Sequence, residues 1–224
     1  MKQFMAAIAM LIVSFAIAQD EVEYPVDDFS ELKVFDGISV KLIPGKENKV
    51  VIKGEDARSV TVRWVRGKLK IRMEIEKLFS GYATFAEVYY NKPLSVLDVN
   101  ENALITSDEV IDQVDLELRA QEAGEIDLKV ALKRLRVKSV TGATIAVEGS
   151  AKNQVVDVNT GGGYEAGNLE TEQTEVEVNA GGYADIRASE YVDATVRAGG
   201  NINIYGKPRV IDQTKFLGGT IKEF

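Results

Sequence analysis

The second half of the chain repeats itself at a nearly constant interval. The segment Val156-Asp157-Val158-Asn159-Thr160-Gly161-Gly162 aligns with the segment Val176-Glu177-Val178-Asn179-Ala180-Gly181-Gly182, one repeat later. Equivalent positions recur at nearly equal spacing on both sides, at Leu97, Leu116, Val137, Val156, Val176, Ala194 and Gln213. A repeat of about 19 residues is typical of a solenoid, in which each coil packs only on its neighbours.

The repeat also predicts which residues face the core, because successive side chains of a strand point to opposite faces. Before the glycine turn, the inward columns are Leu97, Leu116, Val137, Val156, Val176 and Ala194, and Val99, Leu118, Val158, Val178 and Val196, with Ser139 interrupting the second. After the turn they are Ile145, Tyr164, Ala184, Ile202 and Ile221, and Val147, Ala166, Ile186 and Ile204. The sequence therefore predicts an all-β fold: a parallel β-helix with coils of roughly 19–20 residues and two or three short strands in each. We expect a right-handed helix because parallel crossovers almost always have that hand.

Paired glycines follow the first strand of four coils, at 161/162, 181/182, 199/200 and 218/219. Tight corners require a positive φ or a missing Cβ, and glycine supplies both. The pair at 181/182 also resembles part of a calcium-binding nonapeptide repeat, but the short period of that repeat is absent, so we expect no calcium site. Asn159 and Asn179 would stack one coil apart, at a spacing that allows their side chains to hydrogen-bond.

Residues 1–18 have the features of a secretory signal peptide. They carry one charge at Lys2, an apolar run to Ala18 and a small-residue pattern before Gln19. The run is too short to span a bilayer, and no later segment is apolar enough to do so, so we expect no transmembrane anchor after cleavage. The sequence predicts export to the periplasm, the cell surface or the extracellular medium.

The rest of the chain divides by its patterning. We predict an N-terminal linker over 19–32 and a single β-helical domain over 33–224. Within that domain, residues 33–95 would form N-terminal strands and a cap, with a turn at Arg66-Gly67, and residues 96–224 would form the repeating coils.

Composition excludes several kinds of chemistry. The chain has no Cys and no His, so the usual zinc, haem and iron-sulfur ligand sets and the Ser-His-Asp triad are absent. Loss of Lys2 with the signal peptide lowers the formal charge from −8 to −9, which makes nucleic acid a poor partner. We expect no cofactor, no metal site and no catalytic residues.

An aromatic cluster precedes the coils, at Phe79, Tyr82, Phe85, Tyr89 and Tyr90. Exposed rings could stack on sugars, which makes Tyr82, Tyr89 and Tyr90 candidate ligand-stacking residues. The alternative is that the cluster caps the end of the solenoid, since a terminal coil must be covered. Tyr89 and Tyr90 would point to opposite faces if this segment is a strand.

Outward carboxylates would stack in two pairs, Glu165 with Asp185 and Asp157 with Glu177. Paired acids can hydrolyse glycosidic bonds, and β-helical folds host enzymes that cleave polysaccharides. Among 35 acidic residues, however, a solvated surface position is the default expectation.

The opening Phe35-Asp36-Gly37-Ile38-Ser39-Val40, the glycine-rich coils and the endings Ile202-Asn203-Ile204-Tyr205-Gly206-Lys207-Pro208 and Leu217-Gly218-Gly219-Thr220-Ile221 resemble the bacterial head GIN domain family. Its members are described as auto-transporter adhesins. The resemblance covers roughly residues 30–223 and implies an exported β-helical domain without assigned catalytic residues.

Together these observations predict a non-enzymatic, adhesin-like binding protein of the cell envelope, whose ligand is a glycan or an envelope protein. One alternative is an enzyme acting on polysaccharides on the same scaffold. Another is a structural envelope protein that self-associates through its sheets or open ends.

Overall fold

The computed structural model describes residues 21–78 and 80–224 of the 224-residue chain. The predicted signal peptide and Phe79 lie outside these residues. The described part is all-β and contains no α-helix, only three single-turn 3-10 helices: η1 (Ala57–Ser59), η2 (Ile75–Lys77) and η3 (Gly81–Ala83). The predicted fold class is confirmed.

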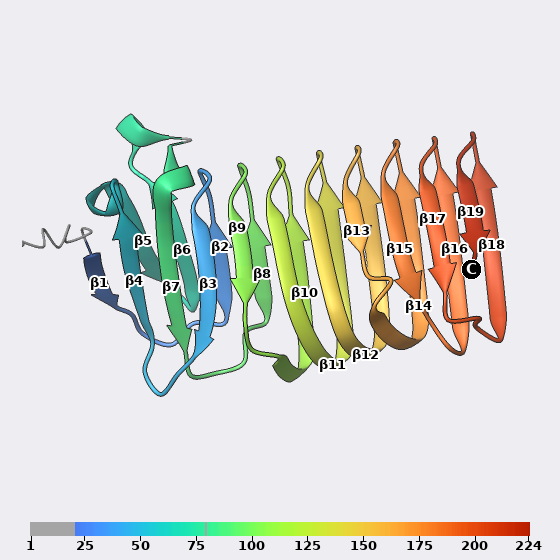
Figure 1. Cartoon of the computed structure of the whole chain (residues 1–224), viewed down its shortest axis with the longest axis horizontal. Helices are drawn as coiled ribbons and strands as arrows, with labels where there is room; N and C mark the ends of the chain where they lie inside the picture. Colours follow the sequence, from blue (N-terminus) through green and yellow to red (C-terminus); the bar gives the residue numbers. More distant parts are fainter. Residues whose placement is uncertain (1–20, 79) are drawn as a thin grey trace, which may run out of the picture.

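The 19 strands of the described residues form one hydrogen-bonded sheet that folds into two facing halves, which we call sheet A and sheet B (Figure 1); β11 and β12 run through both. Sheet A runs, in spatial order, through β5 (Val60–Val65), β6 (Lys68–Met73), β2 (Glu31–Val34), β8 (Val96–Val99), β10 (Ile111–Ala120), β11 (Glu125–Val140), β12 (Thr144–Asn159), β14 (Leu169–Asn179), β16 (Tyr191–Arg197) and β18 (Val210–Phe216). Sheet B runs through β1 (Glu21–Pro25), β4 (Lys49–Gly54), β7 (Thr84–Tyr90), β3 (Ser39–Pro44), β9 (Leu104–Ser107), the first halves of β11 and β12, β13 (Gly163–Glu165), β15 (Tyr183–Arg187), β17 (Asn201–Tyr205) and β19 (Thr220–Glu223). Every pairing from β2 and β3 onward toward the C-terminus is parallel, so each coil contributes one strand to each sheet.

The N-terminal end of the solenoid is closed by antiparallel strands. β4 pairs antiparallel with β7, β1 with β4, and β5 with β6. The β5–β6 connection is the predicted Arg66-Gly67 turn, where both residues have positive φ (51° and 77°). β1 and the start of β2 fall within residues 19–32, where the sequence suggested a linker. This cap gives the first coil a strand partner on its N-terminal side in both sheets.

Eight tight turns in the described residues connect sheet A to sheet B and align along one edge, uppermost in Figure 1. The first left-handed residue of each has φ between 48° and 62°; these residues are Asp36, Glu101, Glu122, Thr141, Thr160, Ala180, Ala198 and Leu217. The predicted role of the paired glycines is confirmed, and the two members of a pair meet different requirements. Gly161 has φ 70°, whereas a Cβ on Gly162 would lie 2.5 Å from the Ser139 carbonyl oxygen.

The inward columns form one continuous core, and the register corrects one prediction. Leu97 pairs with Leu118, not with Leu116, and Val99 pairs with Ala120. Leu116 instead begins a column with Leu135 and Gln154. The misalignment arose because Leu116 and Leu118 both face inward, so alternation does not distinguish registers that differ by two positions.

The asparagines also behave differently from the prediction. Asn159 donates to Asp157 of its own strand, and Asn179 donates to Glu177 Oε1 at 2.8 Å. They do not bond to each other, because the outward carboxylate two positions earlier offers a charged and therefore stronger acceptor.

The C-terminal end of the solenoid has no covering strand in the described residues. The inward positions of β18 are Ile211, Gln213 and Lys215, which continue columns of apolar residues. In β19, Glu223 continues the column of Ile204. The last coil therefore replaces core side chains by polar ones, a recognised way of discouraging edge-to-edge pairing.

Candidate functional site

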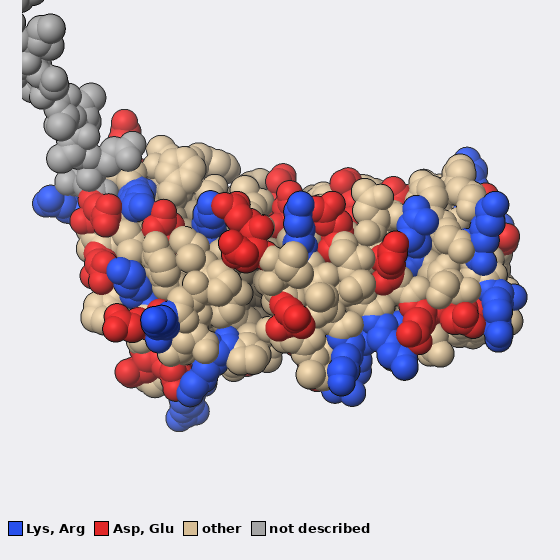
Figure 2. Space-filling view, turned by 60° about the horizontal axis from the view of Figure 1, so that its bottom comes forward, with Lys and Arg blue, Asp and Glu red and all other residues tan. Residues whose placement is uncertain are grey.

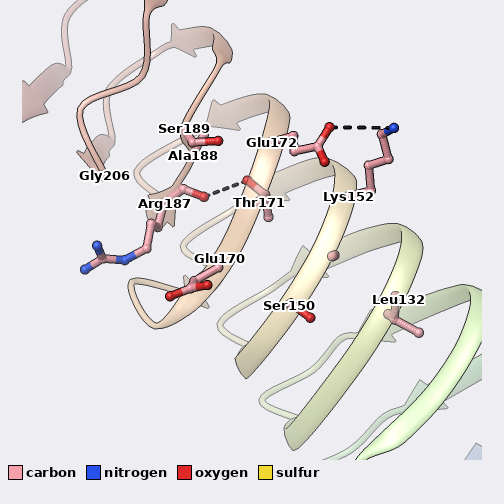
Figure 3. A pocket seen from close by; sticks show the side chains of 11 residues that line it. Leu132, Ser150, Lys152, Glu170, Thr171, Glu172, Arg187, Ala188, Ser189 and Gly206 are labelled. Carbon is pink, nitrogen blue, oxygen red and sulfur yellow. Dashed lines mark hydrogen bonds and ion pairs between the residues drawn. The ribbon is translucent and has the colours of Figure 1, made fainter.

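A groove of about 480 Å³ lies along the edge opposite the tight turns, where the chain bends from sheet B to sheet A (Figure 3). The groove forms where the coils stop sharing one continuous strand between sheet B and sheet A. β12 passes through the bend without a break, whereas the following coils are interrupted between β13 and β14 and between β15 and β16. We call it the edge groove; it is lined by Leu132, Ser150, Ala151, Lys152, Glu170, Thr171, Glu172, Arg187, Ala188, Ser189 and Gly206.

The floor of the edge groove is apolar and its rim is polar. Leu132, Ala151 and Ala188 are buried, while Lys152 and Glu172 form an exposed ion pair at 3.7 Å. None of the lining residues is a large exposed aromatic or aliphatic side chain, the kind that anchors protein–protein interfaces.

One hydrogen bond and one cation–π contact hold the side chain of Arg187 at one end of the groove. Its Nε donates to the Gly167 carbonyl at 2.7 Å, and its guanidinium lies 5.9 Å from the ring centroid of Tyr205. Tyr205 in turn stacks on Phe224 with centroids 5.2 Å apart. With Nε engaged, the two terminal guanidinium nitrogens remain available to a ligand.

A buried polar chain supports the groove from inside the core. Tyr164 is fully buried, and its hydroxyl donates to Gln154 Oε1 at 2.8 Å. Gln154 Nε2 donates to Thr174 Oγ1 at 2.9 Å, and the Thr171 hydroxyl contacts Thr174 and donates to the Arg187 carbonyl at 2.6 Å. Burial raises the pKa of the Tyr164 hydroxyl, so it stays protonated and acts as a donor.

The two acids that line the groove lie at its surface. Glu170 and Glu172 are both exposed, and Glu172 is paired with Lys152. A general acid at neutral pH needs a carboxyl whose pKa is raised, commonly by burial in an apolar pocket. Among residues 21–78 and 80–224, no group of three or more acids is arranged to hold a metal ion.

The structure separates the three tyrosines proposed from the sequence. Tyr82 lies in η3 and packs against the turn at Gly37, where an added Cβ would lie 3.1 Å from its ring. Tyr89 lies near the C-terminal end of β7 and points outward. Its hydroxyl donates to Glu87 Oε2 at 3.0 Å, and Lys49 Nζ lies 5.2 Å from its ring centroid. Tyr90 points the opposite way and packs against the core. The segment belongs to the N-terminal cap, and the three rings do not share one surface.

The predicted carboxylate pairs do lie side by side, since Glu165 pairs in register with Asp185 and Asp157 with Glu177. Each acid, however, has its own donor. Tyr183 donates to Glu165 Oε1 at 2.7 Å, and Asn203 donates to Asp185 Oδ1 at 2.7 Å. Burial and this contact with Glu165 raise the pKa of Tyr183 to about 12. These carboxylates therefore form hydrogen-bonded ladders across the coils.

Sequence reasoning missed the edge groove. Its residues lie between positions 132 and 206, in corner segments that follow no regular alternation. The sequence signal that could have indicated the groove was the variation in coil length at these corners. On the face shown in Figure 2, acidic and basic side chains are interspersed, and neither sign forms a continuous field there.

The described residues form a capped β-solenoid with a polar groove along one edge. The chain belongs to the family described as "Putative auto-transporter adhesin, head GIN domain", whose model matches residues 28–208. The resemblance noted in the sequence is thereby confirmed.

Solved structures share the fold at low sequence identity. A protein described as a "putative adhesin" from Bacteroides fragilis is 19% identical, with a TM-score of 0.83 over 93% of this chain and 98% of the other. A "putative adhesin" from Parabacteroides distasonis is also 19% identical, with a TM-score of 0.73 over 92% and 96%. A "putative lipid binding protein" from the same species is 15% identical, with a TM-score of 0.67 over 91% and 96%. Among curated proteins none matches the chain significantly.

Proposed function

We propose that the chain is an exported, non-enzymatic binding protein of the cell envelope that holds a glycan in the edge groove. The observation that carries the proposal is the composition of the groove. Hydroxyl, amino, carboxylate and guanidinium groups line a narrow apolar floor. Such a lining suits a ligand that offers many hydroxyls and little apolar surface.

Export and surface location are supported by the family and by the sequence of residues 1–18. The family description names adhesins, which act at the cell surface. The described residues contain no helix long and apolar enough to cross a membrane.

The lack of catalytic activity is supported by the geometry of the carboxylates. The outward acids at 165, 185, 157 and 177 each accept a hydrogen bond from a neighbouring side chain, and Glu172 is held in an ion pair. A protein partner in the groove is less favoured because the lining offers no large apolar anchor.

The test is binding of the purified protein, with residues 1–18 removed, to an array of bacterial and host glycans. The double substitution Lys152→Ala/Glu172→Ala removes both rim charges and should reduce glycan binding about tenfold, equivalent to about 1.4 kcal/mol. The matched control is Lys129→Ala/Glu148→Ala, which removes another exposed ion pair, at 2.8 Å, and should leave binding unchanged. Absence of binding to every glycan of the array, or an equal loss of binding in both variants, would refute the proposal. Capture of an envelope protein by the same groove would favour the protein partner.

A further inference from the structure

A row of cations crosses the N-terminal half of sheet A on its outward face. In-register pairing places Arg63 beside Lys70, Lys70 beside Lys33, Lys33 beside Asp98, Asp98 beside Arg119, and Arg119 beside Lys138. We call these six residues the sheet A row. At about 4.8 Å between strands, its five steps span about 24 Å.

Several members of the row have no carboxylate partner. Lys33 bonds Asp98 at 2.5 Å, and Arg119 bonds Glu117 at 2.7 Å. Arg63, Lys70 and Lys138 form no ion pair with any carboxylate in residues 21–78 and 80–224. In a chain with a net charge of −8, three unneutralised cations on one row are unexpected.

The arrangement at β5 and β6 is unfavourable without a ligand. Arg63 and Lys70 are directly opposite each other in an antiparallel pair, and like charges at such positions destabilise a sheet. Lys70 is held 4.5 Å above the Phe35 ring centroid, and the Arg72 guanidinium lies 5.7 Å from the same centroid. An anion bound between these groups would neutralise the repulsion.

Two surface depressions follow the row. One of about 540 Å³ is lined by Arg63, Lys70 and Arg72, and also by the exposed Glu74 and Glu76. Another of about 460 Å³ is lined by Lys33, Arg119 and Lys138, and also by Asp98 and by Glu117, the ion-pair partner of Arg119. The only acid of the row, Asp98, is 6% exposed and already accepts from Lys33 and from Asn100 Nδ2, at 2.9 Å. It therefore presents little free negative charge to a ligand.

We infer that the sheet A row binds a linear polysaccharide bearing carboxylates. Its free cations lie at the two ends of the row, separated by neutralised pairs, which suits a polymer with spaced charges. Duplex DNA is much more densely charged along its axis than this spacing of free cations. A membrane surface requires a broad cationic plane, whereas this row is one residue wide. The site is separate from the edge groove and does not depend on the function proposed for that groove.

The test uses polygalacturonate as the acidic probe and dextran as the neutral one, with binding measured by biolayer interferometry. We expect the wild-type protein to bind polygalacturonate but not dextran, with affinity that falls as salt rises. The variant Arg63→Gln/Lys70→Gln/Lys138→Gln should lose at least about tenfold in affinity, because charge-assisted hydrogen bonds are lost.

The matched control is Lys46→Gln/Lys207→Gln/Lys222→Gln, which changes the net charge equally at exposed positions outside the row. It should retain wild-type affinity within about twofold, as should the edge-groove variant Lys152→Ala/Glu172→Ala. Absence of wild-type binding, or equal loss in both triple variants, would overturn the inference. So would tighter binding to duplex DNA or to vesicles of anionic lipid through the same three residues. Circular dichroism should show that the row variant is folded, since it removes a repulsive pair.

Discussion

Gln213 and Glu223 join the two sheets across the open C-terminal end of the core. Gln213 Nε2 donates to Glu223 Oε1 at 2.9 Å, and the two side chains occupy positions that are apolar in the preceding coil, at Ala194 and Ile204. The pair places polar groups over this end of the core, and among the described residues no strand pairs with the outer side of β18 or β19.

This relationship predicts that Gln213→Leu/Glu223→Leu will promote end-to-end association. The double variant extends the apolar columns to the free edge, where another copy can add strands. Sedimentation velocity should show a shift from the wild-type species to larger ones at micromolar concentration. Asp115→Leu/Arg134→Leu, which replaces an exposed ion pair away from this end, is the control and should leave the sedimentation coefficient unchanged. If both variants associate equally, the polar end does not limit self-association.

The buried polar chain predicts a large cost for Gln154→Leu. The substitution leaves the Tyr164 hydroxyl without its acceptor inside the core and removes one of the two hydrogen bonds of Thr174 Oγ1, which keeps its contact with Thr171. Loss of a buried hydrogen bond with an unsatisfied partner costs about 1–3 kcal/mol. Urea unfolding should show this decrease in the free energy of unfolding, whereas Gln173→Leu, on the exposed face of the same coil, should change it by no more than about 0.5 kcal/mol. Equal effects would mean that the polar chain contributes no stability.

Glu101, in the tight turn between β8 and β9, predicts a pH dependence of the free energy of unfolding. Burial and the neighbouring Asp36 raise the pKa of Glu101, and Glu122 adds to this while Arg72 opposes it. Asp36 is fully buried, and its Oδ1, like Glu101 Oε2, lacks a hydrogen-bond partner. A proton on Glu101 would satisfy both oxygens.

Because the folded-state pKa of Glu101 is raised, its contribution to stability is complete below the unfolded pKa and is lost as pH rises through the folded pKa. Glu101→Gln should therefore be more stable than wild type at pH 7, with the difference vanishing toward pH 4. Urea unfolding at a series of pH values measures this difference, in which the contributions of carboxylates distant from Glu101 cancel. Glu122→Gln, at the equivalent exposed turn position, should show a smaller effect, and a constant Glu101→Gln difference across this range would contradict the assignment.

Two glycines with positive φ predict different costs for the same substitution. Gly142 (φ 71°) has open space around an added Cβ, so Gly142→Ala should cost about 1–2 kcal/mol from backbone conformation alone. Gly149 (φ 107°) would place that Cβ 2.2 Å from the Val130 carbonyl oxygen in the neighbouring coil. Gly149→Ala should therefore cost about 3 kcal/mol or more. Denaturant unfolding of the two variants should show this order, and equal costs would mean that the corner relaxes freely.

Much of the fold was predictable because its signals are local. The repeat at Val156 and Val176 and the glycines after it indicated coils, turns and inward faces, since alternation and positive φ are properties of a few neighbouring residues. The same reasoning placed Tyr89 and Tyr90 on opposite faces. It did not place Tyr82 relative to them, because that position depends on packing against Gly37, which belongs to a distant part of the chain.

The sequence by itself determined the solenoid, its coil length and its family. Only the tertiary structure decided the register at Leu118, the edge groove and the sheet A row. A shift of two positions keeps every side chain on the same face, so hydrogen bonding between coils had to select the register. Arg63, Lys33 and Lys138 are scattered along the chain and lie on one row only because strands from distant segments pair in register. Binding surfaces of a solenoid arise from this stacking, which local sequence patterns do not encode.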